Sequence, residues 1–152
     1  MSNPSKDLIE AESTLRTIIE TLIDDQEGYQ KIGDALENET LKRFFLAESL
    51  KRAEFRGELE SILHHEGVHD IHETGSAAGT FVRVWTELKT ALGGGAETLL
   101  ETAEEAEDAA KQVYADALDH WLPATIREVL VRQAAHIEAS HYYVKAAREA
   151  SK

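Results

Sequence analysis

The feature that most constrains the fold is a helical repeat of apolar residues that runs through nearly the whole chain. Apolar side chains recur every three or four residues, and no stretch shows the alternation typical of a β-strand. The two prolines, Pro4 and Pro123, both lie where a helix would begin. The pattern predicts four long helices, at about residues 6–36, 39–66, 96–119 and 124–150, and a shorter one at about 77–92.

The lengths of the connections predict how these helices are arranged. Short turns at 37–38 and 120–123 make two antiparallel helical hairpins, with Asn38 as a cap of the second helix. The connection at about 67–96 is long enough to traverse a bundle, so the second and third long helices should run parallel, as in ferritin-like bundles. We therefore expect an all-α, ferritin-like four-helix bundle, 1–152, as a single domain. The short helix in this connection should lie across the outside of the bundle.

Charge and composition exclude several classes of function. The chain has 29 acidic and 16 basic residues, a net charge of −13, which repels nucleic acid and anionic membrane surfaces. There is no cysteine, so disulfides, thiolate metal sites and cysteine nucleophiles are excluded. No apolar run approaches the roughly 20 residues that a membrane span needs, and the first residues lack a signal-peptide core. We expect a cytoplasmic protein without nucleic-acid or membrane partners. Whether it forms a homo-oligomer is not determined by the sequence.

The core-facing stripe of each predicted long helix turns polar at one common level. Counted from the turns, this level lies about 15–18 Å from one end of the bundle, at 1.5 Å per residue. In the first helix Gln26 is centred, although one residue of helical slip would bring in Asp25 or Glu27 instead. Charged residues that are buried together need partners. The predicted members of this buried polar network are Gln26, Glu48, Arg52, Glu107, Gln133 and His136, with Ser140 also projecting inward.

Two interpretations of this level stay open. Ferritin-like carboxylate proteins hold two metals with one Glu from each of two helices and Glu-x-x-His from each of the others. Here Glu48, Glu107 and His136 would be the metal ligands, for iron or manganese, and a two-metal site would recruit Asp25 or Glu27. Arg52, however, is permanently charged and repels a divalent ion, and its spacing from Glu48 suits an ion pair. The favoured interpretation is a metal-free network without a cofactor.

Several segments of the chain resemble a bacterial ferritin-like family of unknown function, whose members are labelled as four-helix-bundle proteins. The resemblance spans about residues 8 to 149. It implies a ferritin-like fold and supplies no activity. Where the family often has an acidic residue before the glutamate of EGY, this chain has Gln26, whereas His141 follows the family's pattern. The segments are DDQEGYQ (24–30), LKRFFLAESLKRAEFRGEL (41–59), GSAAGTFVRVWTELKTALGGG (75–95), EEAEDAAKQVYADAL (104–118) and LPATIREVLVRQAAHIEASH (122–141).

The histidine-rich stretch HHEGVHDIH (64–72) is predicted to lie far from the polar level. His64 and His65 would end the second helix, where the helix dipole favours positive charge. His69 and His72 belong to the connection, and His120 lies in the last turn, at the same end of the bundle. A helix cap with a loop is the expected role of this stretch, and a surface zinc or nickel site is the alternative.

Three function hypotheses follow. The first is a non-enzymatic bundle, a scaffold or stress-related protein, with a metal-free network. The second is a metal-dependent oxidase, peroxidase or iron-handling protein with Glu48, Glu107 and His136 as ligands. The third is a small-molecule binder, which requires a cavity at the polar level. Tyr29 and Tyr114, near this level, would be core aromatics bonded to the network, or redox-active residues beside a metal.

Overall fold

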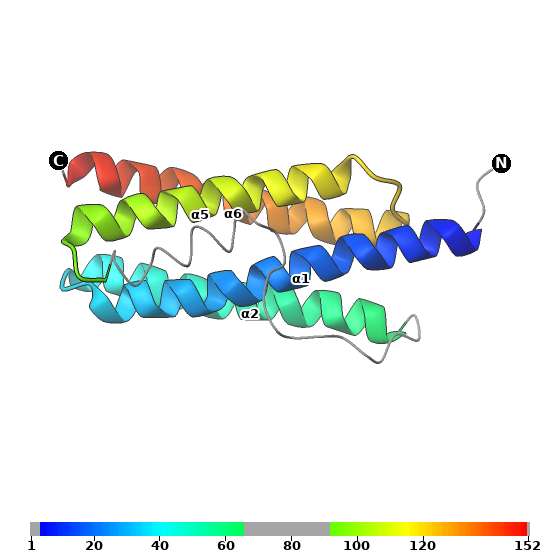
Figure 1. The fold of residues 1–152 in the computed structure, drawn as a ribbon, viewed down its shortest axis with the longest axis horizontal. Helices are drawn as coiled ribbons and strands as arrows, with labels where there is room; N and C mark the ends of the chain where they lie inside the picture. Colours follow the sequence, from blue (N-terminus) through cyan, green and yellow to red (C-terminus); the bar gives the residue numbers. More distant parts are fainter. Residues whose placement is uncertain (1–3, 66–91, 152) are drawn as a thin grey trace.

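The protein is an all-α four-helix bundle in the computed structural model, which describes residues 4–65 and 92–151 (Figure 1). The helices are α1 (Pro4–Ala35), α2 (Glu39–His65), α5 (Ala96–Leu118) and α6 (Ala124–Ala150). The four predicted long helices are confirmed, with ends within two residues of the observed ones. The predicted short helix at 77–92 lies, apart from Leu92, outside the described residues.

The helix ends follow from local sequence signals. The side chain of Asn38 accepts a hydrogen bond from the backbone N–H of Leu41 at 3.0 Å, so Asn38 caps the start of α2 as predicted. Pro123 immediately precedes α6, where its missing N–H costs nothing because the first turn has no intrahelical acceptor. These signals place the two short turns and so define the two hairpins.

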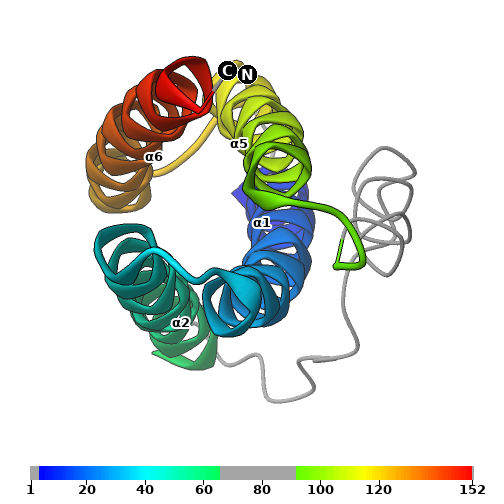
Figure 2. The same ribbon diagram turned by 90° about the vertical axis from the view of Figure 1, so that its left-hand side faces the viewer.

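The hairpins are α1–α2 and α5–α6, and α2 and α5 run in the same direction (Figure 1). This is the parallel arrangement that the long connection predicted. Viewed along the bundle, α1 lies between α2 and α5, and α6 lies between α5 and α2 (Figure 2). The helices α2 and α5 are therefore diagonal to each other. Within the described residues, no helix is long and apolar enough to cross a membrane.

The core consists of two apolar clusters. A band of buried polar residues separates them at one level in every helix. The inward-facing side of each helix is therefore apolar towards both ends and polar in between. The members of the two clusters that lie nearest the band are Ile23 and Tyr29 in α1, Phe55 and Phe45 in α2, Ala109 and Ala103 in α5, and Ile137 and Val144 in α6.

Gly33 of α1 lies in close contact with Leu46 of α2. A Cβ atom placed on Gly33 would be 2.8 Å from Cδ2 of Leu46 and 3.3 Å from its backbone nitrogen. The absence of a side chain therefore allows the two helices to pack close to their turn.

Candidate functional site

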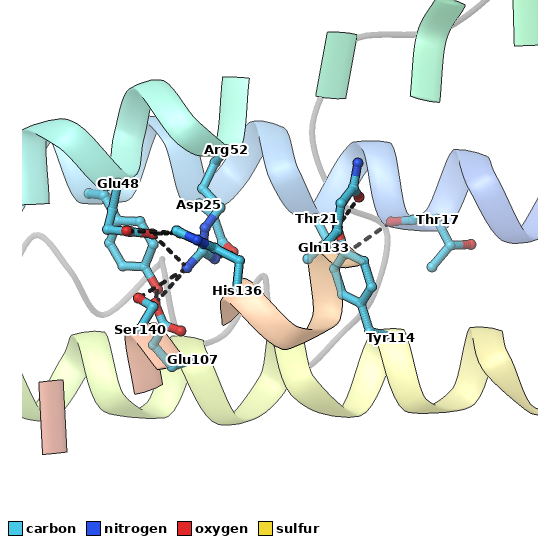
Figure 3. Close-up of polar contacts among 11 residues, drawn as sticks. Thr17, Thr21, Asp25, Glu48, Arg52, Glu107, Tyr114, Gln133, His136 and Ser140 are labelled. Atoms are coloured by element: carbon cyan, nitrogen blue, oxygen red, sulfur yellow. Dashed lines mark hydrogen bonds and ion pairs between the residues drawn. The ribbon is translucent and has the colours of Figure 1, made fainter. Parts of the chain in front are cut away.

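The centre of the polar layer is the guanidinium of Arg52, which projects from α2 into the middle of the bundle and is fully buried (Figure 3). Its Nη1 donates a hydrogen bond to Oδ2 of Asp25 on α1 at 3.0 Å. Its Nη2 lies 2.9 Å from Oε1 of Glu107 on α5 and 3.3 Å from Oε2 of Glu48, one turn earlier on α2. One permanent cation thus joins carboxylates from three helices.

Glu107 collects most of its hydrogen bonds on one oxygen. Its Oε1 accepts from Arg52, from the hydroxyl of Tyr29 and from Oγ of Ser140, the last at 2.9 Å. Its other oxygen, Oε2, is buried and has no hydrogen-bond partner among the residues that the structure describes. The guanidinium carbon of Arg52 also lies 5.0 Å from the centre of the Tyr29 ring, within the range of a cation–π contact.

His136, on α6, forms the outer edge of the layer. Its Nε2 lies 2.9 and 3.0 Å from the two carboxylate oxygens of Glu48. The side chain of His136 is 33% exposed and that of Glu48 is 10% exposed, whereas Arg52 and Asp25 are fully covered. Water therefore reaches the layer from the side of α2 and α6.

The layer contains more negative than positive groups. Three carboxylates, Asp25, Glu48 and Glu107, face one guanidinium and one imidazole. If all three carboxyl groups are ionised, the layer keeps one excess negative charge even with His136 protonated. This excess favours a cation or a retained proton within the layer.

Burial and neighbouring charges keep Arg52 charged and Tyr29 protonated. Burial alone would lower the pKa of the Arg52 guanidinium, but the surrounding acidic groups, above all Glu107, outweigh burial and raise this pKa well above its ordinary value. Burial, followed by the charge of Glu107, raises the pKa of the Tyr29 hydroxyl well above its ordinary value. The Tyr29 hydroxyl is therefore a permanent hydrogen-bond donor to Glu107.

A second polar group lies farther along the bundle, around Gln133 of α6. Its side-chain oxygen accepts from the hydroxyl of Tyr114 at 2.7 Å. Its side-chain nitrogen donates to the backbone oxygen of Phe55 at 3.3 Å and to Oε1 of Glu58 at 3.4 Å. Glu58 also pairs with Arg132, whose side chain is mostly exposed. Gln133 thus joins α5, α6 and α2 without contacting Arg52 through these bonds.

The structure corrects the prediction that Gln26 belongs to the buried network. Asp25 is fully buried and reaches Arg52, whereas Gln26 is only half-buried and its backbone oxygen accepts from Ser49 Oγ at 2.7 Å. The physical reason is that Asp25 continues the alternating spacing of three and four residues of the buried side chains Leu22 and Tyr29, whereas Gln26 lies 100° farther round the helix. Glu48, Arg52, Glu107 and His136 lie together. Ser140 and Tyr29, which were expected to face this level, both donate hydrogen bonds to Glu107.

The three candidate metal ligands do not converge on one point. The guanidinium of Arg52 lies between Glu48 and Glu107, and His136 contacts Glu48 from the outer side. Within residues 4–65 and 92–151, no three His, Asp or Glu side chains form a cluster that could hold a metal ion. Glu48, Glu107 and His136 would have to rearrange before they could bind one ion together.

The remaining histidines lie away from the layer. His64 and His65 end α2 as predicted and are exposed. They line a hollow of about 460 Å³ together with Thr125 and other residues at the start of α6. His69 and His72 lie outside the described residues. A second hollow, of about 320 Å³, lies between α1 and α5, and neither hollow is lined by a residue of the Arg52 layer.

His120 and His141 have partners of their own. Nδ1 of His120 lies 2.8 Å from the backbone oxygen of Asp116, one turn earlier on α5. Nε2 of His141, which is buried on α6, lies 2.7 Å from Oδ1 of Asp108 on α5. His141 therefore links the two helices of the second hairpin.

Comparison with known proteins places most of the chain in one family. Residues 10–120 match the family described as Domain of unknown function (DUF2383). This range includes Asp25, Glu48, Arg52 and Glu107 of the layer and ends before α6. A comparison with curated proteins gives no match. The match covers well over half of the chain, which therefore belongs to this family, Domain of unknown function (DUF2383).

Proposed function

We propose that the chain is a ferritin-like bundle with a non-enzymatic role, a scaffold or stress-related protein, in which Arg52 holds the polar layer together without a metal. The observation that carries this proposal is the fully buried guanidinium with hydrogen bonds to Asp25, Glu48 and Glu107. In ferritin-like carboxylate proteins, metals occupy the corresponding level of the bundle. Here an organic cation takes the central position.

The chemistry of arginine supports this role. Its guanidinium is charged at every physiological pH, is planar, and donates several hydrogen bonds in fixed directions. It can therefore bond to carboxylates from different helices at once, as Arg52 does, and it repels a divalent ion placed beside it. The partners of Arg52 come from α1, α2 and α5, and Ser140 of α6 lies 3.3 Å from Nη2. In this proposal the layer stabilises the arrangement of the four helices and has no catalytic role.

One observation favours a second candidate function, a metal-dependent oxidase, peroxidase or iron-handling protein. The layer has an excess of carboxylates, and Oε2 of Glu107 is buried without a hydrogen-bond donor among the described residues. Both features suit an additional cation. In this candidate, Glu48, Glu107 and His136 are the ligands, and the guanidinium of Arg52 must first leave the space between the two carboxylates.

Metal loading separates the two candidates. Untagged protein is incubated anaerobically with Fe(II) or Mn(II) and desalted, and its metal content is measured by mass spectrometry. We expect less than stoichiometric metal in the natural protein. Stoichiometric metal that is lost in Glu107→Gln would overturn the metal-free network.

Two arginine variants show whether the guanidinium is what keeps metal out. Arg52→Met removes the buried cation, and we expect its metal content to rise because three carboxylates lose their partner. Arg56→Met is the matched control, since Arg56 lies one turn later on α2, is only partly buried and pairs with Glu60. It should load no more metal than the natural protein. Equal metal content in both variants would contradict the role given to Arg52.

The scaffold role rests on the surface of the protein. The net charge of −13 favours basic partners over nucleic acid and anionic membranes. Self-association of this single-domain chain in the cytoplasm is part of the proposal, and sedimentation analysis over a range of protein and salt concentrations tests it. A monomer under all conditions would restrict the scaffold role to other partners.

A further inference from the structure

We propose that the bundle opens along one seam, between α2 and α6, while α1 and α5 stay packed together. Such an opening would give water and small solutes access to the Arg52 layer. The proposal concerns the route to the layer and does not depend on whether the layer binds a metal. The outer part of the seam is defined by three side-chain pairs, each with one member on α2 and one on α6: Phe44 with Tyr143, Glu48 with His136, and Glu58 with Arg132. Two buried hydrogen bonds also join these helices, from Gln133 to the backbone oxygen of Phe55 and from Arg52 to Oγ of Ser140.

The seam is the least closely packed of the four neighbouring helix pairs. The backbones of α2 and α6 approach each other less than those of α1 and α2, α5 and α6, or α1 and α5 (Figure 2). The helices meet mainly through long side chains. The rings of Phe44 and Tyr143 stack with their centres 4.0 Å apart, and His136 reaches Glu48 at 2.9 Å. Separating α2 from α6 therefore breaks few close backbone contacts.

The pairs of the seam are also partly hydrated already. Tyr143 is 39% exposed, and the side chains of Arg132 and His136 are 57% and 33% exposed. Breaking contacts that water already reaches costs less free energy than breaking buried ones, because the freed groups are readily solvated. These three pairs thus oppose an opening of the seam less than the two buried hydrogen bonds between α2 and α6 do.

The opposite boundary, between α1 and α5, is built differently. Its polar contact at the level of the layer is the hydrogen bond from Tyr29 to Glu107, and both residues are fully buried. The inner face of α5 is rich in buried alanines, which allow a neighbouring helix to pack closely. Because the backbones of α1 and α5 also approach each other more closely than those of α2 and α6, this side serves as the hinge.

Opening about this hinge would expose the layer in a defined order. His136 moves away with α6 and leaves Glu48, which uncovers the guanidinium of Arg52. Asp25 stays with Arg52, since both belong to the α1–α2 hairpin. The Arg52–Glu107 bond joins the two hairpins in the centre of the bundle and therefore limits how far they separate. The seam therefore leads directly to the most buried charges of the protein.

Spin-label distance measurements can test this motion, because the chain has no cysteine of its own. The seam pair is Ala47→Cys on α2 with Ala139→Cys on α6, and the hinge pair is Lys31→Cys on α1 with Glu105→Cys on α5; all four positions are exposed. Pulsed electron–electron double resonance gives the distance distribution of each labelled pair in the full-length chain. Each pair is also measured with Tyr143→Ala, which removes the ring stack.

We expect the seam pair to show a second, longer distance that becomes roughly two- to tenfold more populated in Tyr143→Ala, as for the loss of an aromatic pair. The hinge pair should keep one distance in every protein. Glu58→Gln, which weakens the seam without creating a void, serves as a milder variant if Tyr143→Ala loses helicity. A single unchanged distance for the seam pair in all variants, or equal broadening of both pairs, would overturn the proposal.

Discussion

Arg52 of α2 and Glu107 of α5 bond across the diagonal of the bundle, with Nη2 of Arg52 2.9 Å from Oε1 of Glu107 and both side chains at most 1% exposed. Diagonal helices are not neighbours, so this ion pair joins the two hairpins through the centre of the molecule (Figure 2). A buried ion pair of this kind is costly to break, because removing one partner leaves the other charge buried with neither water nor a counter-charge.

Arg52→Met should lower the free energy of unfolding by about 3–5 kcal/mol, because three buried carboxylates lose their cation. Arg56→Met, on the same helix, removes a partly exposed pair with Glu60 and should change stability by less than about 1 kcal/mol. Urea unfolding followed by circular dichroism measures both variants. Similar losses for the two variants would show that the layer does not hold the helices together.

Gly33→Ala and Gly57→Ala should have opposite effects on stability. A methyl group at Gly33 would meet Leu46 at 2.8 Å, so we expect a loss of about 1–3 kcal/mol from overpacking. Nothing lies within 4 Å of a Cβ at Gly57, which is exposed in the middle of α2. There alanine should raise stability by up to about 1 kcal/mol through its higher helix propensity. Thermal unfolding of both variants checks the contrast, and a stabilising Gly33→Ala would refute the close approach.

Alkaline unfolding should coincide with the ionisation of two tyrosines. Burial raises the pKa of Tyr29 and Tyr114 well above the ordinary value of 10.0. The stability contributed by their protonated hydroxyls is complete below pH 10.0 and is lost as the pH rises toward the raised values, since only the unfolded chain releases these protons.

The measurement is the ultraviolet absorbance of phenolate recorded together with circular dichroism during a pH titration. Part of the absorbance should appear in a cooperative step, at the pH at which the helices unfold. This step should shrink in Tyr29→Phe and in Tyr114→Phe. Full ionisation of all four tyrosines before any loss of helix would contradict the burial of Tyr29 and Tyr114.

Glu58→Gln should lower the melting temperature at neutral pH and leave it unchanged in acid. The hydrogen bond from Arg132 lowers the pKa of the Glu58 carboxyl below its ordinary value of 4.5. The pair therefore stabilises the folded state above pH 4.5, and this contribution is lost as the pH falls through the lower value in the folded state. Because the pair is largely exposed, the effect on the melting temperature should be small.

Melting temperatures of the natural protein and of Glu58→Gln, measured from neutral pH into acid, test this expectation. The curves should converge at the acid end. Glu54→Gln is the control, because Glu54 is exposed and lies at 3.5 Å from Lys51 of its own helix. A difference for Glu58→Gln that persists at the lowest pH would point to packing rather than charge.

The bundle could be predicted from the sequence because its signals are local. The apolar repeat fixes where helices form, Asn38 and Pro123 fix where two of them begin, and the length of the connection fixes the parallel direction of α2 and α5. None of these signals requires knowledge of distant contacts. The residues from 66 to 91 lie outside the described part, so the predicted helix there stays a prediction.

The position of the polar layer along the bundle could be predicted from the sequence, but not all of the residues that form it. Counting residues from the turns placed Glu48, Arg52, Glu107 and His136 at one height, and the structure brings these four together. The residue of α1 predicted to be centred was wrong by one position, because a straight helix drifts by about 20° per heptad from the regular seam on which Asp25 lies. Over the two to three heptads before Asp25, this drift amounts to about half the rotation between neighbouring residues.

Partner choice within the layer was the other part that the sequence did not determine. Gln133 and Arg52 project to similar heights, yet Gln133 bonds to Tyr114 and to Phe55, while Arg52 bonds to Asp25 and the glutamates. Pairings of this kind depend on side-chain lengths and on spacings between helices of a few ångströms. A projection of each helix onto a wheel contains neither quantity.

The layer restricts how the length of this chain can change. Asp25 and Arg52 lie on the two arms of the first hairpin, and Glu107 and Ser140 lie on the two arms of the second. One residue inserted between either pair and its turn would rotate a helix by 100° and shift it by about 1.5 Å, which would separate the partners. Insertions within the two turns, or additions at the far ends of the helices, leave the pairing intact. We therefore expect relatives of different length to have their insertions or deletions within the two turns, or outside the segments that join Asp25 to Arg52 and Glu107 to Ser140.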